Sequence, residues 1–153
     1  MSGVTSGGPG LVAVGEDWTD TESGGGRAAV WTSPDGVAWT RVPDDEAVFS
    51  VAGRNTSMGQ VATLGSTLVA TGIALDPTSK GAHQPLVWSS TDGITWSVMD
   101  LGPLFDTGEI GYLDSLTAGG PGVVAVGRVE EATPNHEWAP ADALVLTAVP
   151  ADQ

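Results

Sequence analysis

The sequence contains no cysteine, so the chain can form no disulfide and can perform no thiol chemistry. Basic residues are almost as scarce. Five of the 153 residues are lysine or arginine, against 19 aspartates and glutamates, and the net charge is −14. A surface of that sign repels the phosphates of nucleic acids and of anionic lipids. We therefore expect no nucleic-acid partner.

Long apolar runs are also missing. No stretch is long enough to span a bilayer as a helix, and no signal-peptide pattern precedes the domain. We expect no membrane insertion, and a secreted or cell-envelope protein whose signal peptide is absent from this chain. We predict no cofactor, although the many acids leave Ca²⁺ open as a ligand.

Glycine and proline are abundant, with 22 and 10 residues, and this punctuation is typical of an all-β protein with many turns. The chain also repeats itself. The run LVAVG at residues 11–15 returns as LVATG at 68–72, 57 residues later, and as VVAVG at 123–127. A period of this length indicates a repeat architecture.

Each complete unit is predicted to contain four strands. The first strands cover 1–6, 58–64 and 113–118, and the LVAVG-type runs follow as second strands. The third strands end near Trp31, Trp88 and residues 143–147, and the fourth strands carry Trp39 or Trp96. Because the second and third strands are apolar throughout, we expect them to be covered on both faces.

Repeated four-stranded units with doubly covered inner strands favour a β-propeller of antiparallel meanders, with about three blades in this chain. We place the repeats at 1–57, 58–112 and 113–153 within one propeller segment, the last unit lacking its outer strand. A β-sandwich is the alternative, but it does not require a 57-residue repeat.

Short and long connections alternate along the chain. The turns between first and second strands, and between third and fourth, are short, whereas the connections 16–28, 73–85, 128–142, 43–57 and 100–112 are long. In an antiparallel meander, alternate connections lie at opposite ends of the sheet. We therefore expect the long loops to share one end, and functional residues to lie there.

A turn motif occurs twice, as WTSPDGVAWT at 31–40 and WSSTDGITWS at 88–97. Asp-Gly suits a tight turn, and a serine two residues earlier can bond turn amides. The pattern Ser-x-Asp-Gly-x-x-Trp resembles the Asp box of sialidase-like, BNR-repeat propellers, shortened by one residue. The structural box residues predicted in this way are Ser33, Asp35, Gly36, Trp39, Ser90, Asp92, Gly93 and Trp96.

In that family the box is structural and lies opposite the ligand face, in agreement with the argument from loop lengths. Sialidase catalysis, as the resemblance implies it, uses three arginines, a tyrosine–glutamate pair and an acid. This chain has four arginines, one tyrosine and no Arg-Ile/Leu-Pro signature. Because a fold does not fix a function, we expect binding rather than catalysis and assign no catalytic residue.

Other chemistry has little support. His83 and His136 lie in adjacent long loops, and a shared metal would need Glu137 or Asp142 as a third ligand. The acidic runs at 44–46 and 130–131 could serve glycoside hydrolysis, but such runs usually form a solvated face. We predict no metal site.

The long-loop end suits binding better, because aromatic residues there lie beside acids and amides. Phe49 and Phe105 are expected to fill space between neighbouring units. The predicted ligand-binding residues are Trp18, Arg27, Arg54, Tyr112, His136 and Trp138. We expect a non-catalytic module that binds a glycan or a protein; the alternative is a fragment of a glycoside-acting, sialidase-like enzyme.

Propellers close with about four to eight blades, and three units make half of a ring. We therefore predict a homodimer of six blades, with residues 1–4 of one chain near 144–150 of the other.

Overall fold

Antiparallel β-structure makes up most of the computed structural model. The described residues form eleven strands and one short helix in three separate sheets, which confirms the predicted all-β class. The structure describes residues 1–19, 25–51, 54–75, 83–101, 104, 109–120, 122–131 and 140–148.

Each sheet is a meander whose strands lie in the order in which the chain forms them. The first sheet contains β1 (Gly3–Gly7), β2 (Gly10–Asp17), β3 (Arg27–Ser33) and β4 (Thr40–Arg41). The second contains β5 (Asn55–Leu64), β6 (Thr67–Leu75), β7 (His83–Ser90) and β8 (Ser97–Asp100). The third contains, among the described residues, β9 (Glu109–Gly119), β10 (Gly122–Glu131) and β11 (Ala141–Ala148).

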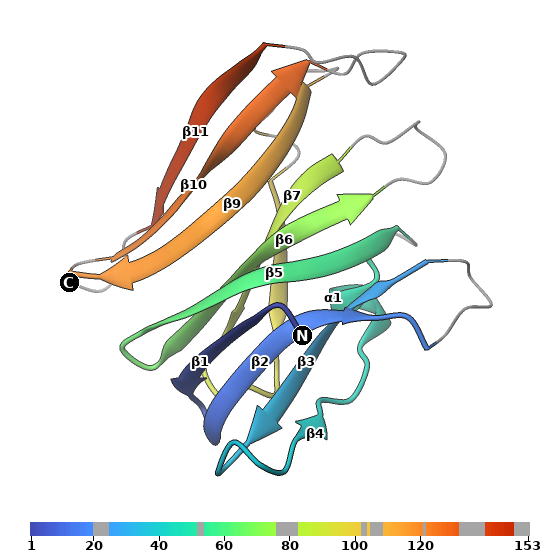
Figure 1. The fold of residues 1–153 in the computed structure, drawn as a ribbon, viewed down its shortest axis with the longest axis vertical. Helices are drawn as coiled ribbons and strands as arrows, with labels where there is room; N and C mark the ends of the chain where they lie inside the picture. The colour runs from blue at the N-terminus through green and yellow to red at the C-terminus, as the bar shows by residue number, and fades with distance from the viewer. Residues whose placement is uncertain are drawn as a thin grey trace.

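The three sheets follow one another in space as they do in the sequence (Figure 1). Strand β5 packs against β1, β2 and β3, and strand β9 packs against β5, β6 and β7. The first strand of one sheet thus makes much of the contact with the preceding sheet. As a result the second sheet is covered on both faces.

The loops that follow the second strands are shorter than predicted. Strand β3 begins at Arg27 and β7 at His83, and β10 continues through Arg128, three residues that the sequence assigned to loops. Pairing extends to Asp17 opposite Arg27 and to Leu75 opposite His83. Backbone pairing does not depend on apolar side chains, so strand ends that carry charges were mistaken for loops.

A short helix, α1 (Glu46–Phe49), lies between the first two sheets in the sequence and was not predicted. Asp45 caps it, since its side chain accepts a hydrogen bond from the Ala47 amide at 3.1 Å. One acid of the run 44–46 therefore has a structural task instead of only facing solvent. The helix carries Phe49 into the protein interior, where it is 3% exposed.

The main core lies between the first and second sheets. Trp88 is fully buried there, and its indole N–H donates a hydrogen bond to the Val48 carbonyl oxygen at 2.9 Å. Phe49 belongs to the same core, as expected of a residue that fills space between units. The buried apolar members are Val12, Val14, Ala28, Val30, Val42, Phe49, Met58, Leu68, Ala70, Ala74, Leu86, Trp88 and Trp96.

Cover on both faces, expected of all inner strands, holds only in part. In β2, Ala13 on one face and Val14 on the other are both buried. In β10, Val123 and Ala125 are buried, but Val124 lies exposed on the opposite face. Neither of these outer faces has a neighbouring sheet among the described residues. Ala13 is small and pairs with the large Trp31, whereas Val124 lies between threonines of β9 and β11.

Each of the two segments that resemble an Asp box, called the first and second box below, is a hydrogen-bonded turn. In the second box, the Asp92 carboxylate accepts from the amides of Ile94 at 2.8 Å and Thr95 at 2.7 Å, and the Ser90 hydroxyl oxygen accepts from the Gly93 amide at 2.9 Å. These amide bonds hold the pKa of Asp92 at about 2. The first box repeats the pattern with Ser33, Asp35, Gly36, Val37 and Ala38.

The two box tryptophans belong to the turn and not to the outer strands as predicted. Strand β4 begins one residue after Trp39, and β8 one residue after Trp96. Each indole N–H donates to the carbonyl oxygen of the box glycine, Gly36 or Gly93, at 3.2 Å. Both glycines have positive φ, 78° and 75°, which their lack of a side chain permits.

The second box also packs on the first sheet. A Cβ atom at Gly8, in the turn between β1 and β2, would lie 2.7 Å from the Asp92 carbonyl oxygen. A Cβ atom at Gly93 would lie 3.2 Å from Pro9 Cδ and 3.0 Å from Val12 Cγ2. The box therefore stabilises both its own turn and the junction between two sheets.

We predict that Ser90→Ala lowers the free energy of unfolding by about 1–3 kcal/mol, because the buried Gly93 amide loses its acceptor. Ser89→Ala is the matched control, since Ser89 is the adjacent serine and is exposed. It should change stability little. Chemical denaturation measures both variants, and equal stabilities would contradict the structural role of the box.

A second prediction concerns acid. Because the pKa of Asp92 is about 2 in the folded protein and its ordinary value is 3.8, its ionised form stabilises the fold above about pH 4. That contribution is lost as the pH falls through 2. Asp92→Asn should therefore melt below the wild type at pH 6, and the gap should close toward pH 2. A gap that stays constant over this range would show that the charge is unimportant.

Candidate functional site

The ends of the sheets opposite the boxes carry the predicted site residues. Trp18 follows β2, Arg27 begins β3, Arg54 precedes β5, and Tyr112 lies near the start of β9. His136 and Trp138 lie outside the described residues, as do Phe105 and Glu137. The described members thus share one end of the molecule, although they form separate clusters there.

Trp18 borders a cavity of about 220 Å³ between the first and second sheets. The indole is 59% exposed, so it forms an open wall and not part of the core. The first sheet contributes Glu16 and Trp18, and the second contributes residues of β5 and β6. The full lining is Glu16, Trp18, Asn55, Thr56, Ser57, Ile73 and Leu75.

Two glycines make room for the polar side chains of this cavity. A Cβ atom at Gly25 would overlap the Asn55 amide group, and one at Gly26 would overlap the Glu16 carboxylate. The Thr56 amide donates to the Gly26 carbonyl oxygen at 3.1 Å, which fixes the glycine pair against β5. The Glu16 and Asn55 side chains can therefore pack directly against the backbone of the two glycines.

The electrostatics of the cavity differ between its two neighbouring acids. Burial raises the pKa of Glu16, and a hydrogen bond with the Trp18 side chain partly offsets this shift. Bonds from the Thr19 hydroxyl and amide lower the pKa of Asp17, which also pairs with Arg41 at 3.1 Å. Of these two acids only Glu16 lines the cavity, where it lies with the amide of Asn55.

The predicted arginines are held by protein groups. Arg27 pairs with Asp44 at 3.1 Å, and Arg54 Nε donates to the Val51 carbonyl oxygen at 3.3 Å. Arg54 Nη1 also donates to the Gln84 side-chain oxygen. Neither arginine is among the described residues that line the Trp18 cavity, so their assignment to ligand binding stays a prediction.

Tyr112 belongs to a cluster that joins the second and third sheets. His83 meets its ring edge-on, with ring centroids 5.1 Å apart, and the Arg128 guanidinium lies 4.1 Å from the ring centroid. Arg128 is itself paired with Asp114 at 2.7 Å and Glu130 at 2.6 Å. Burial, and then the nearby Glu130 charge, raise the pKa of Tyr112. These contacts favour a structural role for Tyr112.

Sequence reasoning missed Glu16, Asn55 and Ser57 as neighbours of Trp18. Asn55 and Ser57 belong to β5, almost forty residues further along the chain, and only the packing of two sheets brings them together. A signal did exist in the repeat. Trp18 lies 57 residues before Leu75, and Glu16 lies 57 before Ile73, so two apolar positions of the second unit are aromatic or charged in the first.

Within the part of the chain that the structure describes, no three histidine or acidic side chains are grouped to hold a metal ion. The pairing of His83 with His136 involves a residue outside that part. No helix among the described residues is long and apolar enough to cross a membrane.

Comparisons with protein-family models, curated proteins and solved structures found no match to this chain.

Proposed function

We propose that this protein is a non-catalytic carbohydrate-binding module whose site is the cavity beside Trp18. The observation that carries the proposal is an exposed indole placed next to a carboxylate, an amide and a hydroxyl, those of Glu16, Asn55 and Ser57. An indole face offers flat apolar area to the C–H face of a sugar ring, and convergent polar groups fix its hydroxyls.

The size of the cavity supports a small epitope. Sites for drug-sized ligands measure about 300–1,000 Å³, and this cavity measures about 220 Å³. It therefore suits one sugar residue at the end of a glycan better than a long internal stretch.

The charge of the cavity favours a neutral sugar. Glu16 lines it, the protein carries a net charge of −14, and Arg27 and Arg54 are engaged with protein groups. An acidic sugar would meet repulsion without a guanidinium to bind its carboxylate. In this respect the site differs from what a resemblance to sialidases implies.

We also propose that the module is a segment of an Asp-box propeller. Three meanders succeed one another, and the first strand of the second and third sheets packs on the sheet before it. The boxes lie at the ends opposite Trp18, as a structural box and a separate ligand face require. These features support propeller blades over a sandwich of two sheets.

Trp18→Ala should reduce binding of a neutral glycan at least ten-fold and leave the melting temperature within a few degrees, since the indole is largely exposed. A glycan array identifies the ligand, and calorimetry compares wild type, Trp18→Ala and Val37→Ala. Val37 is an exposed control residue in the first box turn.

Unchanged glycan affinity in Trp18→Ala would contradict the assigned site. If the protein binds no glycan but binds a protein, and Trp18→Ala abolishes that binding, the site is correct and the ligand is a protein. A panel of fluorogenic glycosidase substrates tests the enzymatic alternative. Turnover by the wild type that disappears in Glu16→Gln would show that the protein is an enzyme and not a binding module.

We further propose that the chain associates with a second copy of itself, and the exposed faces of its outer sheets support this. Val124, Val126 and Val145 form an apolar outer face on the third sheet. On the first sheet, Met1 and Val4 are exposed beside a hollow of about 290 Å³. A second copy presents both faces at once, so the first sheet of each chain covers the third sheet of the other.

We expect the chain to be a dimer by light scattering at low micromolar concentration. Val145→Glu should shift it toward a monomer, because Val145 is 61% exposed on the outer face and burying a charge there in the dimer interface costs free energy. Ile94→Glu, at an exposed position of the second box turn, should remain dimeric. A well-folded wild-type monomer would refute the assembly, and a stable trimer would refute the count of six blades.

A further inference from the structure

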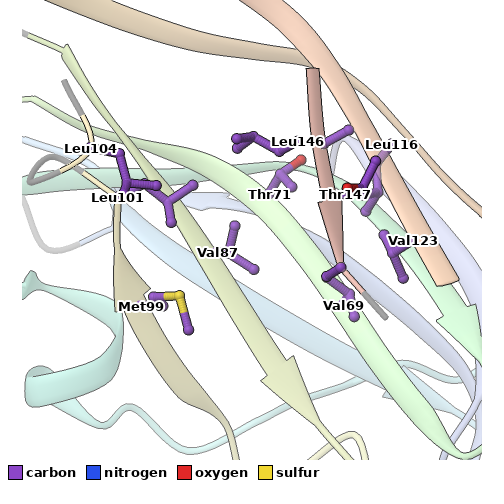
Figure 2. Close-up of a pocket in the computed structure, with 12 residues that line it drawn as sticks. Val69, Thr71, Val87, Met99, Leu101, Leu104, Leu116, Val123, Leu146 and Thr147 are labelled. Carbon is purple, nitrogen blue, oxygen red and sulfur yellow. The ribbon is translucent and has the colours of Figure 1, made fainter. Parts of the chain in front are cut away.

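A second cavity, of about 250 Å³, lies between the second and third sheets (Figure 2). Its walls are almost entirely aliphatic and come from β6, β7 and β8 on one side and β9, β10 and β11 on the other. The exposed side chains of Met99 and Leu104 mark its opening. The lining residues are Val69, Thr71, Val87, Met99, Leu101, Leu104, Leu116, Val123, Ala125, Leu146, Thr147 and Ala148.

The internal repeat explains why this junction is hollow. In the second sheet, Trp88 pairs with Ala70 and fills the space toward the first sheet. The same position in the third sheet is Leu146, which pairs with Ala125. A leucine is much smaller than a tryptophan. Among the described residues, the junction between the second and third sheets therefore keeps a space at this position, whereas Trp88 fills the equivalent position of the first junction.

The repeat also shows that a buried position of the cavity wall is polar. The lining contains two threonines, of which Thr147 is exposed and Thr71 is buried. Val14 of the first sheet pairs with Val30 and is buried against the second sheet. Its counterpart in the second sheet is Thr71, which pairs with Val87 and lines the cavity. Valine and threonine have nearly the same shape, so the substitution adds a hydroxyl and no bulk.

The Thr71 hydroxyl has no hydrogen-bond partner among the described residues, although the residue is only 1% exposed. In Figure 2 its oxygen lies within the ring of aliphatic lining side chains. A buried hydroxyl without a partner is destabilising, whereas the valine of the first sheet would not be. The hydroxyl is thus placed where an occupant of the cavity can bond to it.

We propose that this cavity binds a small, neutral, mostly apolar molecule with one hydrogen-bonding oxygen, which pairs with the Thr71 hydroxyl. A cavity of 150 Å³ holds benzene, so one of this size holds about ten heavy atoms. A charged ligand is excluded, because the described lining carries no charged side chain to compensate it. This site is separate from the Trp18 cavity and does not depend on glycan binding.

The test uses two probes of equal shape, 4-propylphenol and 4-propyltoluene, which differ by a hydroxyl in place of a methyl group. Binding to the wild-type protein is measured by NMR titration. We expect the phenol to bind about ten-fold more tightly, because it alone satisfies the Thr71 hydroxyl. Equal affinities, or no binding of either probe, would overturn the proposal.

Variants locate the binding and separate its two causes. Thr71→Val should lose the preference for the phenol and bind 4-propyltoluene at least as tightly, because the buried phenol hydroxyl then has no partner. Thr71→Ser, which keeps the hydroxyl, should retain the preference for the phenol. Leu146→Trp introduces the residue that the second sheet has at the equivalent position, and this variant should bind neither probe. Leu116→Phe fills the same space from β9 and replaces the tryptophan variant if that variant does not fold. Unreduced binding in a folded cavity-filling variant, or a preserved preference in Thr71→Val, would refute the assignment.

Discussion

The structure depends on one constraint: an inner sheet that is apolar on both faces has to be covered on both faces. A single meander cannot meet this requirement, because water would contact at least one apolar side. The second sheet meets it by packing between its two neighbours, with Trp88 buried on one side and Val87 turned toward the other. The stacking order, the box contacts and both cavities follow from this arrangement.

Much of this fold could be predicted, because its strongest signals are local or periodic. The 57-residue repeat indicated successive meanders, and Asp-Gly turns with their serines indicated where third and fourth strands are joined. The strand ends could not be predicted, since Arg27 and His83 pair through their backbones whatever their side chains prefer. Helix α1 was missed because four residues give no helical periodicity.

The candidate site was less predictable for a physical reason. Trp18 could be selected as a tryptophan outside the box motif. Glu16 and Asn55 become neighbours of Trp18 only when two sheets pack together. Arg27 and Arg54 show the converse, since a sequence cannot reveal that Asp44 and Val51 already bind them. Positions of unsatisfied or convergent polar groups are properties of packing.

An internal repeat helps to identify such positions from the sequence. Equivalent residues of the other units show which side chain packing alone requires. Val14 and Trp88 show that an aliphatic and an aromatic side chain can pack into the core at these positions of a junction between sheets. Thr71 and Leu146 depart from that solution at the next junction, and both changes lower the stability that the repeat could supply. Two destabilising substitutions at one junction are most simply explained by a ligand that binds there. The same comparison of units distinguishes Trp18 from Leu75 in the other cavity.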